Sequence, residues 1–241
     1  MKIFIRILIV LIAAGVVAFL FVNESKPTGS PGSEAEALTD KMWKAIGKKS
    51  WDSLHYVAWS FRDDHHYLWD RKGERAEVAW DEFKVQIDLV EMNFLASEGD
   101  KTLEGEAYEA AKEKAWNYWC NDSFWLNAPA KARDAGTTRS VVKTDRGDGL
   151  MVTYASGGVT PGDAYLWILD ENGLPIAYKM WVKIIPIGGL EATWSNWTDV
   201  NGAKLAAMHE IGGLEVAITN IRGGEGPDAI GIDEAYFSKL P

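Results

Sequence analysis

The sequence has few residues that could support disulfide, thiolate or nucleic-acid chemistry. It contains a single cysteine, Cys120, among 241 residues. One cysteine excludes an intrachain disulfide and any site built from several thiolates. The 25 Lys and Arg residues are outnumbered by 35 Asp and Glu residues, which gives a formal net charge of −10. A surface this acidic repels phosphate backbones, so we expect no nucleic-acid partner.

Catalytic and metal-binding motifs are also missing. The chain has no HExxH, no GxSxG, no glycine-rich phosphate loop and no Asp-rich calcium loop, and it has only four histidines. No internal repeat of 20–50 residues is visible either. We therefore predict a protein that needs no cofactor and no metal ion and that is not an enzyme.

Aromatic residues, by contrast, are abundant. The chain has 12 tryptophans, and 47% of its residues are hydrophobic. Each tryptophan offers a large apolar surface with a single N–H group to satisfy. The composition therefore predicts a folded domain with either a very aromatic core or an aromatic-lined cavity.

The longest apolar stretch lies at the N-terminus. Residues 7–22 carry no charge and follow Lys2 and Arg6. The run is shorter than the roughly 20 residues that span a bilayer, although snorkelling by Arg6 can extend it. A cleaved signal peptide needs small residues after its apolar core, and the last four residues of the run offer none. We predict a transmembrane anchor over residues 1–22, with a signal sequence as the alternative.

Both interpretations give the same location for the rest of the chain. The positive flank stays inside, so the residues after the apolar run leave the cytoplasm for the periplasm or cell envelope. They are then either anchored to the inner membrane or secreted after cleavage. Residues 23–33 are rich in Pro, Gly and Ser and predict a flexible linker, which leads into one domain over residues 34–241.

Hydrophobic periodicity changes along this domain. Residues 34–48 and 105–119 repeat apolar side chains at helical spacing, which predicts two amphipathic helices. Elsewhere a period of two prevails, as in residues 83–89, and it is typical of strands with one covered face. "DENG" at 170–173 and "DVNG" at 199–202 predict tight hairpins, because Asn-Gly tolerates positive φ.

These elements predict an α+β domain. Two or three helices and roughly nine or ten sequential strands, joined by hairpin-length links, favour a single large antiparallel sheet. A sheet that long must curl. We therefore expect a half-open barrel with helices on its concave side, preceded by the membrane segment. Such a sheet encloses either an apolar cavity or a filled core.

This order of elements resembles the LolA/LolB-like periplasmic lipoprotein-carrier superfamily. "LWILDENGLPIAYKMW" followed by "LEATWSNWTDVNGAKLAAMHEI" is similar to its pattern of a strand ending in Asp, a Gly-Leu-Pro turn, a long strand and a "W.dv.G.kl" strand. Three motifs resemble those of a subset of uncharacterised bacterial exported proteins with this fold: "HHYLWDR", "NDSFWLNAPAKARDAG" and "GGVTPGDAYLW". The resemblance covers roughly residues 34–237. It implies the half-open barrel; a retained anchor would distinguish this chain from the soluble or lipid-anchored carriers.

"SFRDDHHYLWDR" places two of the four histidines among carboxylates. Successive side chains of a strand alternate, so His65 and His66 would point to opposite faces and could not readily hold one metal ion. Asp64 and His66 would share a face. Such a carboxylate–imidazole pair serves either general acid–base catalysis or the hydrogen bonding of an imidazole, and we favour the structural role.

Large apolar side chains mark the candidate ligand site. "NDSFWLNAPAKARDAG" predicts an irregular segment, because Pro129 and Gly136 interrupt any period. Its apolar groups would either plug the mouth of the barrel or line a ligand site. With tryptophans from the strand patterns they form the predicted ligand-binding set: Trp59, Trp69, Trp80, Phe124, Trp125, Trp167 and Trp194. Ordinary core packing is the alternative.

We therefore predict a membrane-anchored, extracytoplasmic, non-enzymatic binding module for a lipid or another apolar small molecule. Burial of such a ligand contributes about 25 cal/mol per Å² of apolar area, so no catalytic group is required. Two alternatives stay open. One is a cell-envelope sensor or interaction module with a filled core, whose loops bind a protein partner. The other is a hydrolase that uses Asp64 and His66.

Overall fold

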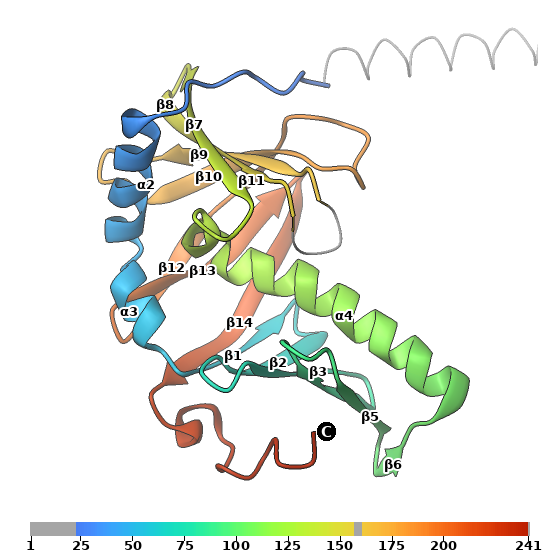
Figure 1. Ribbon diagram of the computed structural model, residues 1–241. Helices are drawn as coiled ribbons and strands as arrows, with labels where there is room; N and C mark the ends of the chain where they lie inside the picture. The colour runs from blue at the N-terminus through green and yellow to red at the C-terminus, as the bar shows by residue number, and fades with distance from the viewer. Residues whose placement is uncertain (1–22, 157–160, 241) are drawn as a thin grey trace, which may run out of the picture.

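The computed structural model of the protein describes residues 23–156 and 161–240. The predicted anchor or signal sequence over residues 1–22 lies outside this described part. Within it, no helix combines the length and the apolar character needed to cross a membrane. The described chain forms one large, open, curved antiparallel sheet accompanied by a few helices (Figure 1). This is the α+β architecture that the sequence predicts.

The sheet has 14 strands, more than the nine or ten that the sequence predicts, and all pairings between named strands are antiparallel. The strands of the first half are β1 (Tyr56–Phe61), β2 (His65–Asp70), β3 (Arg75–Trp80), β4 (Phe83–Asp88), β5 (Phe94–Glu98) and β6 (Lys101–Thr102). Those of the second half are β7 (Thr137–Thr144), β8 (Gly147–Tyr154), β9 (Ala164–Leu169), β10 (Pro175–Trp181), β11 (Leu190–Thr193), β12 (Ser195–Val200), β13 (Ala203–Ile211) and β14 (Leu214–Gly224).

The strand order runs from the middle of the sheet outwards. Strands β1 to β6 lead to one edge, and helix α4 (Gly105–Asn127) then carries the chain to the other edge. Strands β7 to β13 return towards the middle, with β12 paired only to β13, and β14 closes the sheet against β1. Because α4 joins two edges of one sheet, it must cross a face of it, as Figure 1 shows.

Both predicted hairpins are confirmed. Asn201 and Gly202 have φ of 53° and 86° and form the two-residue loop between β12 and β13, as a type I′ turn requires. In the β9–β10 turn, Gly173 has φ 93°. The carboxylate of Asp170 accepts hydrogen bonds there from two backbone N–H groups, at 2.9 and 2.8 Å. Side-chain acceptance of this kind is what favours Asp at the start of a turn.

The first predicted helix is interrupted. It consists of α2 (Ser33–Ala45) and α3 (Lys48–Ser53), separated at Gly47. Gly47 has φ 68°, and a Cβ atom there would lie 1.9 Å from the carbonyl oxygen of Gly202. Only glycine satisfies both conditions. The close approach turns the chain so that α3 packs near β13.

The second predicted helix is longer than expected. Instead of ending near residue 119, α4 continues to Asn127 and leads into the 3₁₀ helix η1 (Ala128–Lys131). The first half of "NDSFWLNAPAKARDAG" is therefore helical, and the prediction of an irregular segment was wrong there. Pro129 ends the regular helix but does not disturb the turns before it. It sits at the start of η1, where a missing N–H costs nothing.

Two apolar clusters fill the side of the sheet that the helices cover. The first lies under the N-terminal part of α4, between it and β1 to β5. The second lies between α2 and strands β8 to β11. Four side chains pack against both clusters: Trp43, Trp125, Trp197 and Ile211. The two halves of the sheet are therefore joined by aromatic contacts as well as by the β1–β14 pairing.

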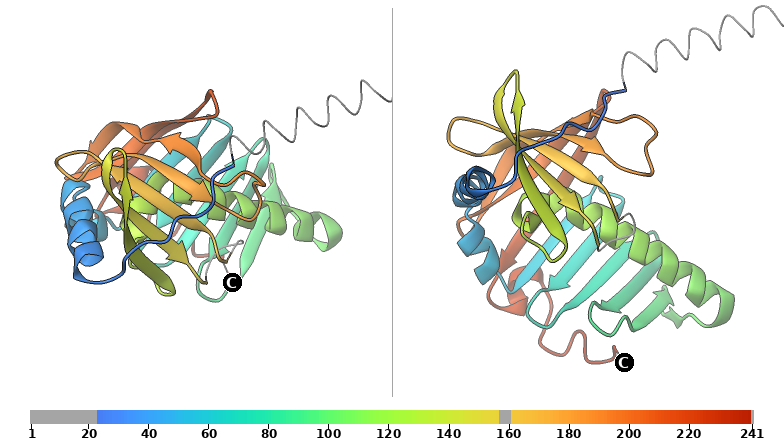
Figure 2. Two further views of the ribbon diagram at one scale, coloured as in Figure 1. Left: turned by 90° about the horizontal axis from the view of Figure 1, so that it is seen from above. Right: turned by 45° about the horizontal axis from the view of Figure 1, so that its top comes forward.

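Residues 23–33, predicted as a flexible linker, lie along the sheet. Ser30 exchanges two backbone hydrogen bonds with Val141 of β7, each 2.9 Å long. Glu24 donates its N–H to the carbonyl oxygen of Gly188 at 2.9 Å. Figure 2 shows this segment crossing strands on the side opposite α4. At Ser30 it pairs with the otherwise open edge of β7, the kind of edge that invites pairing with another chain.

His209 of β13 lies inside the second half of the sheet and has no exposed surface. Its Nδ1 lies 3.0 Å from the carbonyl oxygen of Thr193, and its ring contacts Trp125 and Trp194 at centroid distances of 5.1 and 4.5 Å. Burial lowers the pKa of His209 to about 4. The ring is therefore neutral at pH 7, and protonation of the ring destabilises the native state.

We predict that stability falls as the pH drops from 6.5 towards 4. Over that range the unfolded chain takes up a proton at His209 that the native state does not accept, and the loss between pH 7 and pH 5 is about 2 kcal/mol. Urea unfolding of the wild type and of a His209→Gln variant at both pH values would measure it. The variant should lack this part of the pH dependence, and an identical pH dependence of both proteins would contradict the assignment.

Candidate functional site

Helix α4 is held to strand β2 by one buried carboxylate. Asp122 is 1% exposed and shares the buried face of the helix with Ala111, Ala115 and Trp119. The two alanines let the N-terminal part of α4 approach β3, β4 and β5. Asn and Asp side chains can cap or terminate a helix by bonding to its backbone, and α4 carries such a pair at Asn121 and Asp122. The Asp122 carboxylate instead points to the sheet and bonds to side chains of β2, so it does not compete for the backbone hydrogen bonds of the helix.

Three side chains hold the Asp122 carboxylate. The Tyr67 hydroxyl donates to Oδ2, His65 Nδ1 lies 2.7 Å from the same atom, and the Asn121 amide donates to Oδ1 at 2.7 Å. Burial raises the pKa of Asp122, while these hydrogen bonds lower it in part. Burial, and then the negative charge of Asp122, raise the pKa of Tyr67, so its phenol stays protonated and keeps donating.

His65 connects this network to an open cleft of about 750 Å³. Its ring stacks on Tyr118 with centroids 3.7 Å apart, and its side chain is 18% exposed. The remaining charged lining is mostly acidic: Asp63, Asp64, Asp81, Glu82 and Asp100, with Lys84 and His66 beside them. No three metal-ligating side chains of residues 23–156 and 161–240 converge. The cleft is therefore an open, mostly acidic surface groove, and His65 is the imidazole that links it to the Asp122 network.

The structure places Asp64 and His66 on the same cleft, as side chains that do not bond to each other. Both are exposed on the rim of this cleft, and the His66 Nδ1 lies 2.8 Å from the Ser60 hydroxyl. Within the described residues, no hydrogen bond or ion pair joins the two side chains. The expectation that they share one face of a strand does not apply, because β2 begins at His65 and Asp64 lies in the preceding turn. That turn starts with Arg62 and Asp63 at positive φ.

The paired carboxylate and imidazole are instead Asp122 and His65. Sequence spacing could not show this pair, because 57 residues and a helix crossing separate its members. One signal was present: His65, Tyr67 and the other odd-numbered residues of β2 share a face. Two polar groups on a buried strand face require a polar partner from whatever element covers them.

A second hollow, about 360 Å³ in volume, lies between the C-terminal part of α4 and strands β9 and β10. Its apolar lining consists of Phe124, Trp125, Tyr165, Tyr178, Met180, Val182, Ile184, Ile185 and Ile211, and its other lining residues are Asn117, Cys120, Asn121 and Asp163. Phe124 contacts Tyr165 and Trp125 contacts Tyr178, with ring centroids 4.6 and 5.8 Å apart. We call this hollow the apolar cavity.

The titratable groups of the apolar cavity suit binding better than nucleophilic chemistry. Burial raises the pKa of the Cys120 thiol to about 11, so it is protonated at neutral pH, as expected for an inert thiol. Burial also raises the pKa values of Tyr165 and Tyr178. Both phenols are therefore neutral and can donate a hydrogen bond to a polar group of a ligand.

The structure divides the predicted ligand-binding set. Phe124 and Trp125 line the apolar cavity, and Trp80, which is 3% exposed, lines the acidic cleft. The remaining members are packed into the core or against it: Trp59, Trp69, Trp167 and Trp194. The helices cover the strand residues on the inner face, so most tryptophans of the strands contribute to the core. Phe124 and Trp125 belong to the end of α4 and line the cavity.

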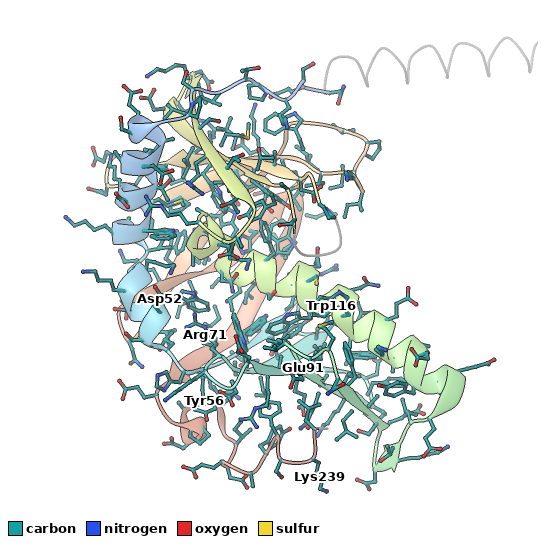
Figure 3. The ribbon with its side chains drawn as sticks, in the orientation of Figure 1. Asp52, Tyr56, Arg71, Glu91, Trp116 and Lys239 are labelled. Carbon is teal, nitrogen blue, oxygen red and sulfur yellow. The ribbon has the colours of Figure 1, made fainter. Side chains whose placement is uncertain are left out.

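Trp69 packs against Arg71, the side chain that Figure 3 labels below α3. The Arg71 guanidinium lies over Trp51 and Trp69, 4.0 and 5.1 Å from their ring centroids. It donates to the carbonyl oxygen of Leu54 at 2.7 Å. Burial lowers the pKa of Arg71 to about 10. This cation joins α3 to the end of β2 through aromatic faces and backbone oxygens, which is a packing role.

We predict that Tyr67→Phe destabilises the protein by about 1–3 kcal/mol, because it removes a donor from a buried carboxylate. Tyr178→Phe is a matched control. Tyr178 is also 1% exposed, and its hydroxyl donates to no partner among the described residues. We expect its substitution to change stability by less than about 0.5 kcal/mol. Denaturant unfolding of both variants at pH 7 would check this, and equal effects would show that the Asp122 network does not stabilise the fold.

Comparison with known proteins gives one structural neighbour to report. No protein-family model matches the sequence, and no curated protein matches it. Among solved structures, a DUF1329 family protein from Desulfovibrio piger is similar over 87% of this chain and 100% of its own length. Its identity to this chain is 11%, and the TM-score is 0.46. The resemblance to lipoprotein carriers stays a prediction, and we infer function from the geometry of the site itself.

Proposed function

We propose that this protein is a non-enzymatic binding module that takes an apolar group, such as a lipid acyl chain, into the apolar cavity. The proposal includes an extracytoplasmic location, with the N-terminal apolar segment as a membrane anchor. It also includes the half-open barrel of the lipoprotein-carrier superfamily as the finer description of the curved sheet.

The apolar cavity is the observation that carries this proposal. Its volume of about 360 Å³ lies within the range of roughly 300–1,000 Å³ that small-molecule sites occupy. Aromatic and aliphatic side chains dominate the lining, and the polar groups are few and confined to Asn117, Asn121, Asp163 and the two phenols. This combination of an apolar wall with a small number of orienting polar groups is typical of ligand sites.

The energetics of such binding need no reacting group. An apolar chain that leaves water for the cavity gains about 25 cal/mol for each Å² of apolar surface buried. The Asp122 network holds the helix that carries Phe124 and Trp125. The two rings pack against Tyr165 and Tyr178, so little of their side-chain freedom remains to be lost on binding. A protonated Cys120 is a compatible neighbour for an acyl chain.

The alternative is an interaction or sensor module whose core is filled. The apolar cavity favours ligand binding over that alternative, because a filled core would leave no hollow lined by Trp125, Tyr178 and Met180. The alternative predicts a specific envelope protein partner and no ligand in the cavity, and lipid cross-linking can distinguish the two.

We expect a phosphatidylcholine with a photoactivatable diazirine on its acyl chain to cross-link to α4. The full chain would be reconstituted in vesicles containing this lipid, irradiated and digested with trypsin. The cavity product falls on the peptide between Lys114 and Lys131, which contains Phe124 and Trp125. Cross-links to residues 1–22 fall on other peptides and do not interfere.

Two tryptophan substitutions make the experiment specific. Ile211 lines the cavity, so Ile211→Trp should reduce cross-linking of this peptide at least tenfold. Ile176 of β10 is 42% exposed and does not line the cavity, so Ile176→Trp should leave the yield within twofold of the wild type. Ile211→Ala enlarges the cavity and should keep the yield. No cross-link in the wild type, or an undiminished one in Ile211→Trp, would refute the proposal.

A further inference from the structure

The loop of residues 182–189, between β10 and β11, forms one wall of the apolar cavity. Val182, Ile184 and Ile185 all line the cavity from this loop. Ile184 is nevertheless 71% exposed, so a single side chain faces both the cavity and solvent. It therefore marks the entrance, and we call residues 182–189 the mouth loop.

The mouth loop is bound to the first described residues of the chain. Glu24 donates its N–H to the Gly188 carbonyl oxygen at 2.9 Å, and Gly188 donates its N–H to Asn23 Oδ1 at 2.8 Å. The Glu24 carbonyl oxygen accepts from Trp181 Nε1 at 2.8 Å, and its carboxylate pairs with Lys179 at 2.7 Å. Backbone and side-chain bonds together fix the position of Asn23 relative to the mouth loop.

The sequence before Asn23 connects this attachment to the predicted membrane anchor. The uncharged apolar run of residues 7–22 ends immediately before Asn23. If that run is inserted in a bilayer, Asn23 lies at the membrane surface, because consecutive Cα atoms are only about 3.8 Å apart. The hydrogen bonds from Asn23 and Glu24 then keep Gly188 next to the same surface.

The composition of the mouth loop suits that position. Residues 182–187 read "VKIIPI", so four aliphatic side chains surround one lysine, and Trp181 precedes them. Tryptophan is enriched at membrane interfaces, aliphatic side chains enter the boundary between headgroups and acyl chains, and lysine reaches the phosphates. Lys183 is the charged residue of the loop, and it is exposed beside Ile184.

We infer that the mouth loop contacts the lipid bilayer through Ile184, so that the apolar cavity opens directly onto the membrane in which the chain is anchored. This inference rests on the proposed binding function and deepens it, because it names the bilayer itself as the source of the ligand. An acyl chain entering past Ile184 would exchange one apolar environment for another without crossing water. The gain from leaving water is then common to bilayer and cavity and does not favour one over the other.

Site-directed fluorescence tests the contact in the full-length protein. Ile184→Cys, in a Cys120→Ala background, would be labelled with the environment-sensitive dye NBD and reconstituted in vesicles of phosphatidylcholine and phosphatidylglycerol. Phosphatidylcholine carrying a doxyl quencher near the headgroup should quench this label. The control is Val90→Cys in the same background: Val90 is 57% exposed and lies in the β4–β5 turn, in the other half of the sheet.

We expect quenching at position 184 to be at least threefold stronger than at position 90. Equal quenching at the two positions, or none at 184, would overturn the inference. Diazirine cross-linking separates this failure from failure of the proposed function. A cavity cross-link without quenching at 184 leaves the binding function standing and removes the membrane contact. Quenching at 184 without a cavity cross-link keeps the contact and removes the binding function.

Discussion

The hydrogen-bonded carboxylate of Asp122 is the contact on which the placement of α4 depends. A helix that joins two edges of a sheet could cross its face at many angles and depths. A buried carboxylate is tolerated only where donors meet it, and here Tyr67 and His65 of β2 supply them. The helix is thereby fixed in register as well as in position. Its alanine-bearing half lies over β3 to β5, and the aromatic rings near its end contact Tyr165 of β9 and Tyr178 of β10.

This placement leaves the acidic cleft and the apolar cavity, two hollows of opposite character, on either side of the anchoring contact. On one side of the anchoring contact, His65 faces a groove surrounded by carboxylates, where water and counterions can screen the charges. On the other side, Phe124 and Trp125 border a hollow with mostly apolar walls. Only the second hollow has a lining that water solvates poorly. The difference in solvation, more than the difference in size, separates the candidate ligand site from the ordinary surface.

Local patterns in the sequence predicted the local elements well. Asn201-Gly202 predicted its hairpin because backbone conformation at a two-residue turn depends on those residues alone. Alternation identified strands such as β4, and their number predicted one large curved sheet. The length of α4 and the roles of Asp122 and His65 were missed, because they depend on contacts between residues far apart in the chain. Trp167 and Trp194 became core residues for the same reason: the helices that cover them are distant in sequence.

The order of strands in the sheet also determines the order in which the fold can be completed. During synthesis β1 to β6 emerge consecutively and can pair with one another as soon as they are available. The β1–β14 pairing that joins the two halves of the sheet cannot form until β14 has been synthesised. Its partners are far apart in the sequence, as Tyr56 lies opposite Gly224. Until then β1 is an exposed edge in the middle of the future sheet. A nascent chain of this topology therefore leaves this edge of β1 without its native partner for most of its synthesis, and contacts of such high sequence separation make the closing step slow.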